Sequence, residues 1–351
     1  LLMAVGVAMV YSTSSVIAMG AFGDAEHYLV RQTCYALAAF GVIVAVARTP
    51  YRFLRRLAYP LMALVFLMLV AVLVPGIGQK IGGARRWLPL GPVRFQPSEL
   101  AKVVAVLYLA HSLTKKEQMI RSFKVGVFPH LLILGMIGGL ILVEPDLGSV
   151  VILALTAAVM LFLGGARLSH LLALAATTAP FAVIYVQSNP YQVNRIKAWL
   201  NPWEHAEGIG WQLVQSYLAF ASGGLAGAGV GGGKQKMYFL PEAHTDFIFA
   251  AMAEEWGLLA TVFVLGAFAI LFWGAISVAR RTADRFAMLL ALGVGCLLTM
   301  EALVNIAITV GLLPTKGLVL PFLSYGGSAL VADAFALGML VSVARHDREN
   351  G

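Results

Sequence analysis

Hydrophobic residues make up 60% of the 351-residue chain and charged residues only 12%, about half the charged share of an ordinary soluble domain. This composition excludes a water-soluble globular protein and indicates a polytopic membrane protein. The formal net charge of +8 does not indicate nucleic-acid binding, because the basic residues lie in short loops between apolar stretches, where they set membrane topology.

Apolar stretches of about 20 residues, long enough to cross a bilayer as helices, recur along the whole chain. The sequence therefore predicts an all-α protein with ten membrane-spanning helices in a single membrane domain over residues 1–351, since no polar block is long enough to fold alone. The chain opens inside an apolar run, and we expect native residues before Leu1. The predicted spans are 1–19, 30–47, 57–75, 98–113, 126–143, 147–164, 170–187, 246–275, 286–312 and 318–344.

Basic residues accumulate in every second loop and in the C-terminal tail. By the positive-inside rule these loops face the cytoplasm, which places both termini there. The two long loops, 76–97 and 187–245, then face the opposite, extracytoplasmic side. They carry further Lys and Arg residues against the topological trend, and this excess indicates a local anionic partner.

The segment Gly223–Gly257 concentrates polar chemistry at the border of an apolar span, reading GGLAGAGVGGGKQKMYFLPEAHTDFIFAAMAEEWG. We predict Asp246 in the first turn of a helix, where the positive end of the helix dipole favours an anion. Eight residues correspond to about 80° around a helix and roughly 12 Å along it, so Glu254 is expected on the same face as Asp246 and Glu255 on the opposite face.

Charged pairs occur in two other places. Glu99 and Lys102, in QPSELAK, are spaced to pair on one helix face, either as a structural ion pair or as part of a substrate cavity. Arg85 and Arg86, in GARRW, are either interfacial anchors or ligands for a pyrophosphate, which the guanidinium fork suits.

Two lysines and a serine are further candidates. Lys234 and Lys236 follow a glycine run whose backbone amides are able to approach phosphate oxygens, although a flexible lid would have the same composition. Ser324 begins the run SYGGS, which offers hydroxyls and small residues that permit close backbone approach.

Other polar residues receive a structural interpretation. The turn Glu144–Asp146 is expected to connect two apolar helices, and His244 is expected to be a solvated loop residue. Glu301 and Asn305, one helical turn apart, are expected to face other helices inside the membrane.

Three motifs occur in an order that identifies a family: GWQLVQSYLAFASGGLAGAGVG, then LPEAHTDFIFA, then LPFLSYGGS. The chain resembles the SEDS family of bacterial cell-wall glycan polymerases over nearly its whole length, and PEAHTDFIFA is closer to members that serve division than to those that serve elongation. The resemblance implies a peptidoglycan glycosyltransferase that polymerises lipid II, with Asp246 as general base. The QPSE run at Glu99 also matches the family.

The same resemblance implies the setting of the reaction. The substrates would be lipid II and an undecaprenyl-pyrophosphate-linked glycan, joined at the outer face of the bacterial cytoplasmic membrane. A divalent cation, Mg or Mn, would take part, and Asp246 or Glu254 would help to hold it, although the sequence has no recognisable metal motif. A class B penicillin-binding transpeptidase and division-complex proteins would be the partners.

Two other functions remain open at this point. A transporter or flippase for the lipid-linked precursor would use buried charges such as Glu99, Lys102 and Asp333 as a polar path. Against it, the polar residues gather at the outer border and in the long outer loops. A scaffold whose loop 187–245 docks a partner would leave Asp246 dispensable.

Overall fold

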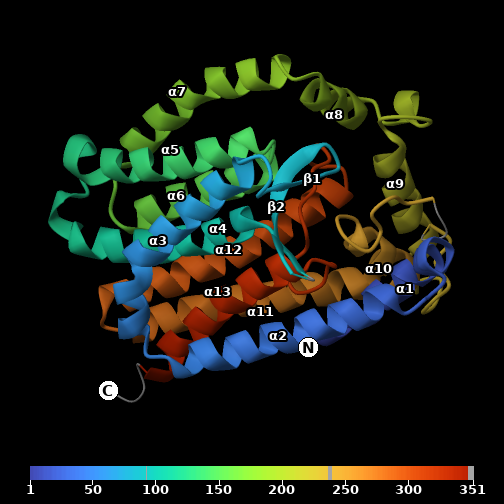
Figure 1. Ribbon diagram of the computed structural model, residues 1–351, viewed down its shortest axis with the longest axis horizontal. Helices are drawn as coiled ribbons and strands as arrows, with labels where there is room; N and C mark the ends of the chain where they lie inside the picture. The colour runs from blue at the N-terminus through green and yellow to red at the C-terminus, as the bar shows by residue number, and fades with distance from the viewer. Residues whose placement is uncertain (92, 236–238, 347–351) are drawn as a thin grey trace. The chain divides into compact units, whose positions relative to one another are not determined.

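The computed structural model describes residues 1–91, 93–235 and 239–346 and is predominantly helical (Figure 1). Among these residues, eight helices are long and apolar enough to cross a membrane, which makes the chain a multi-pass membrane protein. They are α1 (Leu2–Phe22), α2 (His27–Arg48), α3 (Tyr51–Leu73), α5 (Phe128–Val143, extended by a π-turn from Phe123), α7 (Leu168–Gln187), α11 (Leu258–Arg281), α12 (Arg285–Thr309) and α13 (Gly327–His346).

Two shorter or more polar helices occupy the other predicted spans in the first half of the chain. They are α4 (Pro97–Lys115), which carries charged residues, and α6 (Leu147–Leu163), which is apolar but only 17 residues long. α4 begins with proline at its first position, where the missing N–H has no helical partner to lose. The ten predicted spans are therefore all helical over most of their length.

Two predicted spans have wrong boundaries. The span 246–275 is not one helix, because α10 (Ile248–Trp256) ends at Gly257, whose φ of 65° suits only glycine, and α11 begins at the next residue. A Cβ at Gly257 would lie 2.5 Å from the backbone nitrogen of Gly227, so the glycine also permits this close approach. The span 318–344 is helical only from Gly327.

Both long loops contain regular structure. Loop 187–245 holds α8 (Pro190–Leu200), a 3-10 turn (Trp203–His205) and α9 (Trp211–Gly223). The loop at 76–97 forms an antiparallel sheet of β1 (Gln79–Ile81), β2 (Ala84–Leu90) and β3 (Val93–Phe95), in that order, which the sequence analysis did not predict. Gly82 and Gly83, both with positive φ, make the two-residue turn between β1 and β2.

The chain divides into two compact units by its internal contacts. The first comprises residues 1–36, 175–270 and 301–326, and the second comprises residues 37–174, 271–300 and 327–351. The divisions fall inside α2, α7, α11 and α12, so each of these helices contributes one part to each unit.

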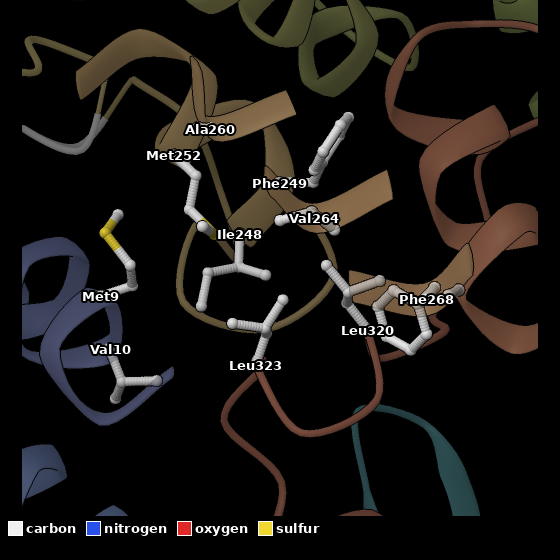
Figure 2. Packing of buried hydrophobic residues seen from close by; sticks show 11 residues of the cluster. Met9, Val10, Ile248, Phe249, Met252, Ala260, Val264, Phe268, Leu320 and Leu323 are labelled. Carbon is white, nitrogen blue, oxygen red and sulfur yellow. The ribbon is translucent and has the colours of Figure 1, made fainter. Parts of the chain in front are cut away.

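The first unit has an apolar core built around α10. Ile248, Phe249 and Met252 of α10 pack with residues of α1 and α11 and with the segment before α13. Figure 2 shows Ile248 and Leu323 facing one another within this cluster. The helix break at Gly257 allows α10 and α11 each to present an apolar face to the same core.

A smaller cluster continues this core toward the polar segment of the first unit. It joins Ala219 of α9 to Leu240, Ala243 and Phe247, with Ala250 of α10 beside them. Burying these apolar side chains fixes the segment 240–247 on α9 and α10.

In the second unit α4 lies in the interior, in contact with α3, α6 and α13, and α5 packs on α6 (Figure 1). Most of the side chains of α4 are buried, including those of Glu99 and Lys102. Gly293 of α12 provides room beside α4 and α6, because a Cβ there would lie 2.7 Å from Val106 Cγ1 and 2.8 Å from the Met160 side chain.

Candidate functional site

Asp246 lies at the end of a turn that precedes α10. The prediction that it sits in the first helical turn is wrong, because α10 begins at Ile248 with Phe247 as its N-cap. The turn closes through the carbonyl of Glu242, which accepts hydrogen bonds from the backbone N–H groups of Thr245 (3.1 Å) and Phe247 (3.2 Å). Hydrogen bonding of the local backbone, and not helix geometry, therefore sets the position of Asp246.

Two side chains from distant parts of the sequence hold the backbone around Asp246. Asn305 of α12 donates from Nδ2 to the Asp246 carbonyl (2.9 Å) and also to the carbonyl of Leu318. Ser324 Oγ donates to the Thr245 carbonyl (2.6 Å) and accepts from the N–H of Leu320 (2.8 Å). The carbonyls of Thr245 and Asp246, on either side of the Asp246 Cα, are thus tied to the segment 318–324, the first directly by Ser324 and the second through Asn305.

This arrangement gives the SYGGS run a physical role. The Tyr325 N–H donates to the His244 carbonyl (2.9 Å), so Ser324 and Tyr325 together grip the backbone of residues 244 and 245. A contact of Ser324 with substrate stays a prediction. Asn305 was expected only to face other helices, and its polarity within an apolar helix was the one sequence signal of this role.

The carboxylate of Asp246 is half-buried and has a glycine on one flank. A Cβ at Gly317 would lie 3.3 Å from Asp246 Oδ2, so any side chain there would crowd the carboxylate. The prediction that His244 is a solvated loop residue is wrong: its ring packs on Tyr28 and Tyr325, with centroids 4.8 and 5.8 Å away. Burial lowers the pKa of His244, while the Glu242 carboxylate opposes this effect, and the imidazole is therefore neutral at pH 7.

Glu254 and Glu255 are both buried, and both hold the glycine-rich loop that follows α9. Glu254 Oε1 accepts the N–H groups of Lys234 (2.8 Å) and Gln235 (3.2 Å), and Oε2 accepts that of Gln235 as well (3.2 Å). Glu255 Oε2 accepts the N–H of Gly231 (3.0 Å), and its Oε1 accepts Ser12 Oγ of α1 (2.6 Å).

The backbone of the same loop approaches α10 just as closely. The N–H groups of Ala228 and Gly229 donate to the carbonyls of Glu254 (2.9 Å) and Glu255 (3.0 Å). The amides that the sequence analysis assigned to phosphate thus bind protein carboxylates. The side chain of Lys234 remains exposed, and its contact with substrate stays a prediction, whereas Lys236 lies outside the described residues.

In the second unit, Glu99 and Lys102 form the predicted pair. Their Oε2 and Nζ atoms are 2.9 Å apart, and both side chains are buried. In the same unit, Asp146 caps α6 by accepting from the N–H (3.1 Å) and Oγ (2.8 Å) of Ser149. Its Oδ2 also accepts from Gln96 Nε2 (3.1 Å) and Ser98 Oγ (3.2 Å), which joins the start of α4 to the start of α6. Asp146 therefore has the structural role that was predicted for its turn.

Arg85 and Arg86 bind backbone carbonyls. Arg86 donates from Nε to the Glu144 carbonyl (2.7 Å) and from Nη2 to the Pro145 carbonyl (2.8 Å), while Arg85 donates from Nη1 to that of Leu73 (3.3 Å). Each arginine thus fastens strand β2 to a helix end. Binding of pyrophosphate by these guanidinium groups stays a prediction.

Glu144 is a fully buried carboxyl whose two oxygens have no hydrogen-bonding partner among the residues described. Burial, reinforced by the neighbouring Asp146 carboxylate and opposed by Arg86, raises the pKa of Glu144 to about 8. The group is therefore protonated at neutral pH, which avoids the high cost of a buried unpaired charge.

The described residues form no cluster that would hold a metal ion through protein ligands alone, and a divalent cation at Asp246 or Glu254 stays a prediction. No group of three His, Cys, Asp or Glu side chains converges within the described parts of the chain. Both oxygens of Glu254 accept N–H donors, so a cation there would face the positive ends of those dipoles. Asp246 offers a single carboxylate.

Comparison with known proteins covers the whole chain. The family model FtsW/RodA/SpoVE, described as cell cycle proteins, matches residues 1–349. A protein of Trichlorobacter lovleyi named probable peptidoglycan glycosyltransferase FtsW is 44% identical over 96% of this chain and 89% of its own. Stage V sporulation protein E of Bacillus subtilis is 38% identical over 99% of this chain and 95% of its own.

Solved structures similar to this chain point to the same family as the sequence relatives. A chain from a study of the structural coordination of polymerization and crosslinking by a peptidoglycan synthase complex superposes with a TM-score of 0.78 at 28% identity, covering 97% of this chain and 96% of that one. The crystal structure of the Thermus thermophilus rod shape determining protein RodA gives a TM-score of 0.69 at 29% identity, covering 99% and 95%. The match of sequence and structure over the full length shows that the chain belongs to the FtsW/RodA/SpoVE family, the SEDS proteins.

Proposed function

We propose that this protein is a peptidoglycan glycosyltransferase that polymerises lipid II into glycan strands, with Asp246 as its general base. The relative named probable peptidoglycan glycosyltransferase FtsW, 44% identical over 96% of this chain, supports the activity. The single structural observation that carries the assignment of the base is the clamp on its backbone. Asn305 and Ser324 fix the carbonyls on both sides of the Asp246 Cα, and Gly317 keeps one flank of the carboxylate uncrowded.

In the reaction, the hydroxyl of an incoming lipid II sugar attacks the anomeric carbon of the growing strand. Asp246 accepts the proton of that hydroxyl as its oxygen bonds to the carbon. The bond from the same carbon to the pyrophosphate oxygen breaks, and its electron pair leaves with undecaprenyl pyrophosphate. Holding the backbone of Asp246 in one place lowers the entropy cost of bringing its carboxylate into the reactive geometry.

The family and the charge pattern support a setting for this reaction. We propose that the termini face the cytoplasm and that Asp246 lies on the outer side of the bacterial cytoplasmic membrane, in agreement with the basic loops. The relative in a complex that couples polymerization to crosslinking supports a class B penicillin-binding transpeptidase as partner, within a division complex. A divalent cation stays part of the proposal only as an ion brought by the pyrophosphate, because Mg²⁺ binds through one or two carboxylates plus phosphates.

The test is polymerisation by purified protein, with and without the transpeptidase, using labelled lipid II and Mg²⁺ or Mn²⁺. We expect glycan ladders on a gel, abolished by Asp246→Asn and retained by Glu242→Gln, which changes an exposed acid four residues away in the same turn. Ladders from the Asp246→Asn protein would refute the role of Asp246. Movement of lipid II across vesicle membranes without ladders would indicate a transporter. Absence of both activities would favour a scaffold.

A further inference from the structure

The first unit contains a cavity of about 510 Å³ at the base of the outer loop. α8 and the beginning of α9 form half of its lining, including Tyr191, Asn194, Arg195 and Trp211, and the segment between them contributes Glu207 to Ile209. Its volume falls within the range of small-molecule sites.

A network of hydrogen bonds makes the frame of this cavity rigid. Arg195 donates to the Thr315 carbonyl and to the hydroxyl of Tyr191, and its guanidinium lies 4.6 Å from the centroid of the Tyr191 ring. Trp199 donates from Nε1 to the Gly311 carbonyl (2.8 Å), which ties α8 to the same segment. A preformed site loses little entropy when a ligand binds.

The remaining polar groups of the lining suit a neutral, polyhydroxylated ligand. Asn194 and Gln212 contribute amides, which can donate and accept hydrogen bonds, and Glu207 contributes a carboxylate, which accepts them. Trp211 donates from Nε1 to the Phe239 carbonyl (2.6 Å), which orients its indole ring as an apolar surface. Among the described lining residues only Arg195 and Glu207 are charged, and their formal charges sum to zero.

The cavity borders both segments that position Asp246. Pro241 is part of its lining and lies five residues before Asp246. Thr315, on the other side, lies two residues before Gly317, whose Cβ position is 3.3 Å from Asp246 Oδ2. A ligand held here would therefore contact the two chain segments that carry and flank the proposed base.

We infer that this cavity is a saccharide subsite that binds the N-acetylated sugars of the glycan, an inference that rests on the proposed polymerase function. The sugar ring would pack its C–H face on Trp211, and its hydroxyl and acetamido groups would bind Asn194, Gln212 and Glu207. A carboxylate-rich stem peptide is a poorer match, because the terminal nitrogens of Arg195 are already engaged.

The experiment measures binding of tetra-N-acetylchitotetraose to the purified full chain carrying Asp246→Asn, which prevents turnover, by calorimetry in detergent. We expect saturable binding that Asn194→Ala and Gln212→Ala each weaken at least tenfold. Asn201→Ala, an exposed amide in the same loop that does not line the cavity, should bind like its parent. Circular dichroism and melting of each variant would establish that the fold is kept.

Three outcomes would overturn the inference: no saccharide binding, binding unaffected by both amide variants, or binding of a soluble stem pentapeptide in place of the sugar. Failure of the proposed function gives a different pattern. Ladders from the Asp246-containing protein without saccharide binding would refute only the subsite. Saccharide binding that depends on Asn194 and Gln212, in a protein that never forms ladders, would refute only the polymerase.

Discussion

Replacing Glu254 with glutamine should release the glycine-rich loop from α10. The carboxylate accepts the N–H groups of Lys234 and Gln235 at 2.8 and 3.2 Å and is 2% exposed. Hydrogen bonds to a charged group contribute about 1.5–3 kcal/mol each, so the two donors stabilise the closed loop by roughly 3–6 kcal/mol. Glutamine keeps the volume and one acceptor, but its NH₂ group would face an N–H donor.

We therefore expect Glu254→Gln to cost about one of these bonds, or roughly 2 kcal/mol, which raises the population of the open loop about 30-fold. Hydrogen exchange followed by mass spectrometry, on peptides covering 225–235, measures this directly. Glu242→Gln is the matched control, because this exposed acid accepts only from the Thr245 hydroxyl (2.7 Å) among the bonds described. Unchanged exchange in Glu254→Gln, or an equal change in the control, would refute the role of Glu254 as the anchor of the loop.

Three further predictions concern the other buried polar groups. Because Glu144 has a pKa of about 8 in the folded protein against 4.5 ordinarily, the unfolded chain releases this proton first, and stability should fall between pH 4.5 and 8, by up to about 1.4 kcal/mol per pH unit. Glu144→Gln should flatten the fall of melting temperature over that window, and an unchanged slope would contradict the assignment. Lys102→Met should cost roughly 3–5 kcal/mol by removing the cationic partner of the buried Glu99 carboxylate. The double variant Lys102→Met/Glu99→Gln should regain the melting temperature of the parent. If the double variant also polymerises lipid II like the parent, the pair is purely structural. Asn305→Leu and Ser324→Ala each remove one hydrogen bond to the backbone beside Asp246, and each should lower kcat up to about 100-fold with KM little changed. Steady-state ladder assays measure both constants, and an unchanged kcat would exclude the positioning role of these side chains.

Local patterns in the sequence were sufficient to predict the membrane spans, one ion pair and the family of this protein. The spans follow from runs of apolar residues, because each helix satisfies its own backbone hydrogen bonds inside a membrane. The Glu99–Lys102 pair follows from a spacing of three on one helix. The motif containing Asp246 identified the family, which the relatives confirm.

Other features depend on partners that are distant in the sequence. Asn305 binds the carbonyl of a residue 59 positions away, and Glu254 binds amides 19 and 20 positions away. No local sequence pattern predicts either contact. Helical periodicity put Glu254 on the face of Asp246, and this failed because the helix does not begin until Ile248.

Composition and short motifs are enough to predict which residues enter the membrane and which family the chain belongs to. Which polar groups are hydrogen-bonded depends on contacts between distant parts of the fold. A buried carboxylate must find donors wherever the fold places them, and here Glu254 and Glu255 find them in the backbone of the glycine loop, whereas Glu144 finds none in the described chain and keeps its proton.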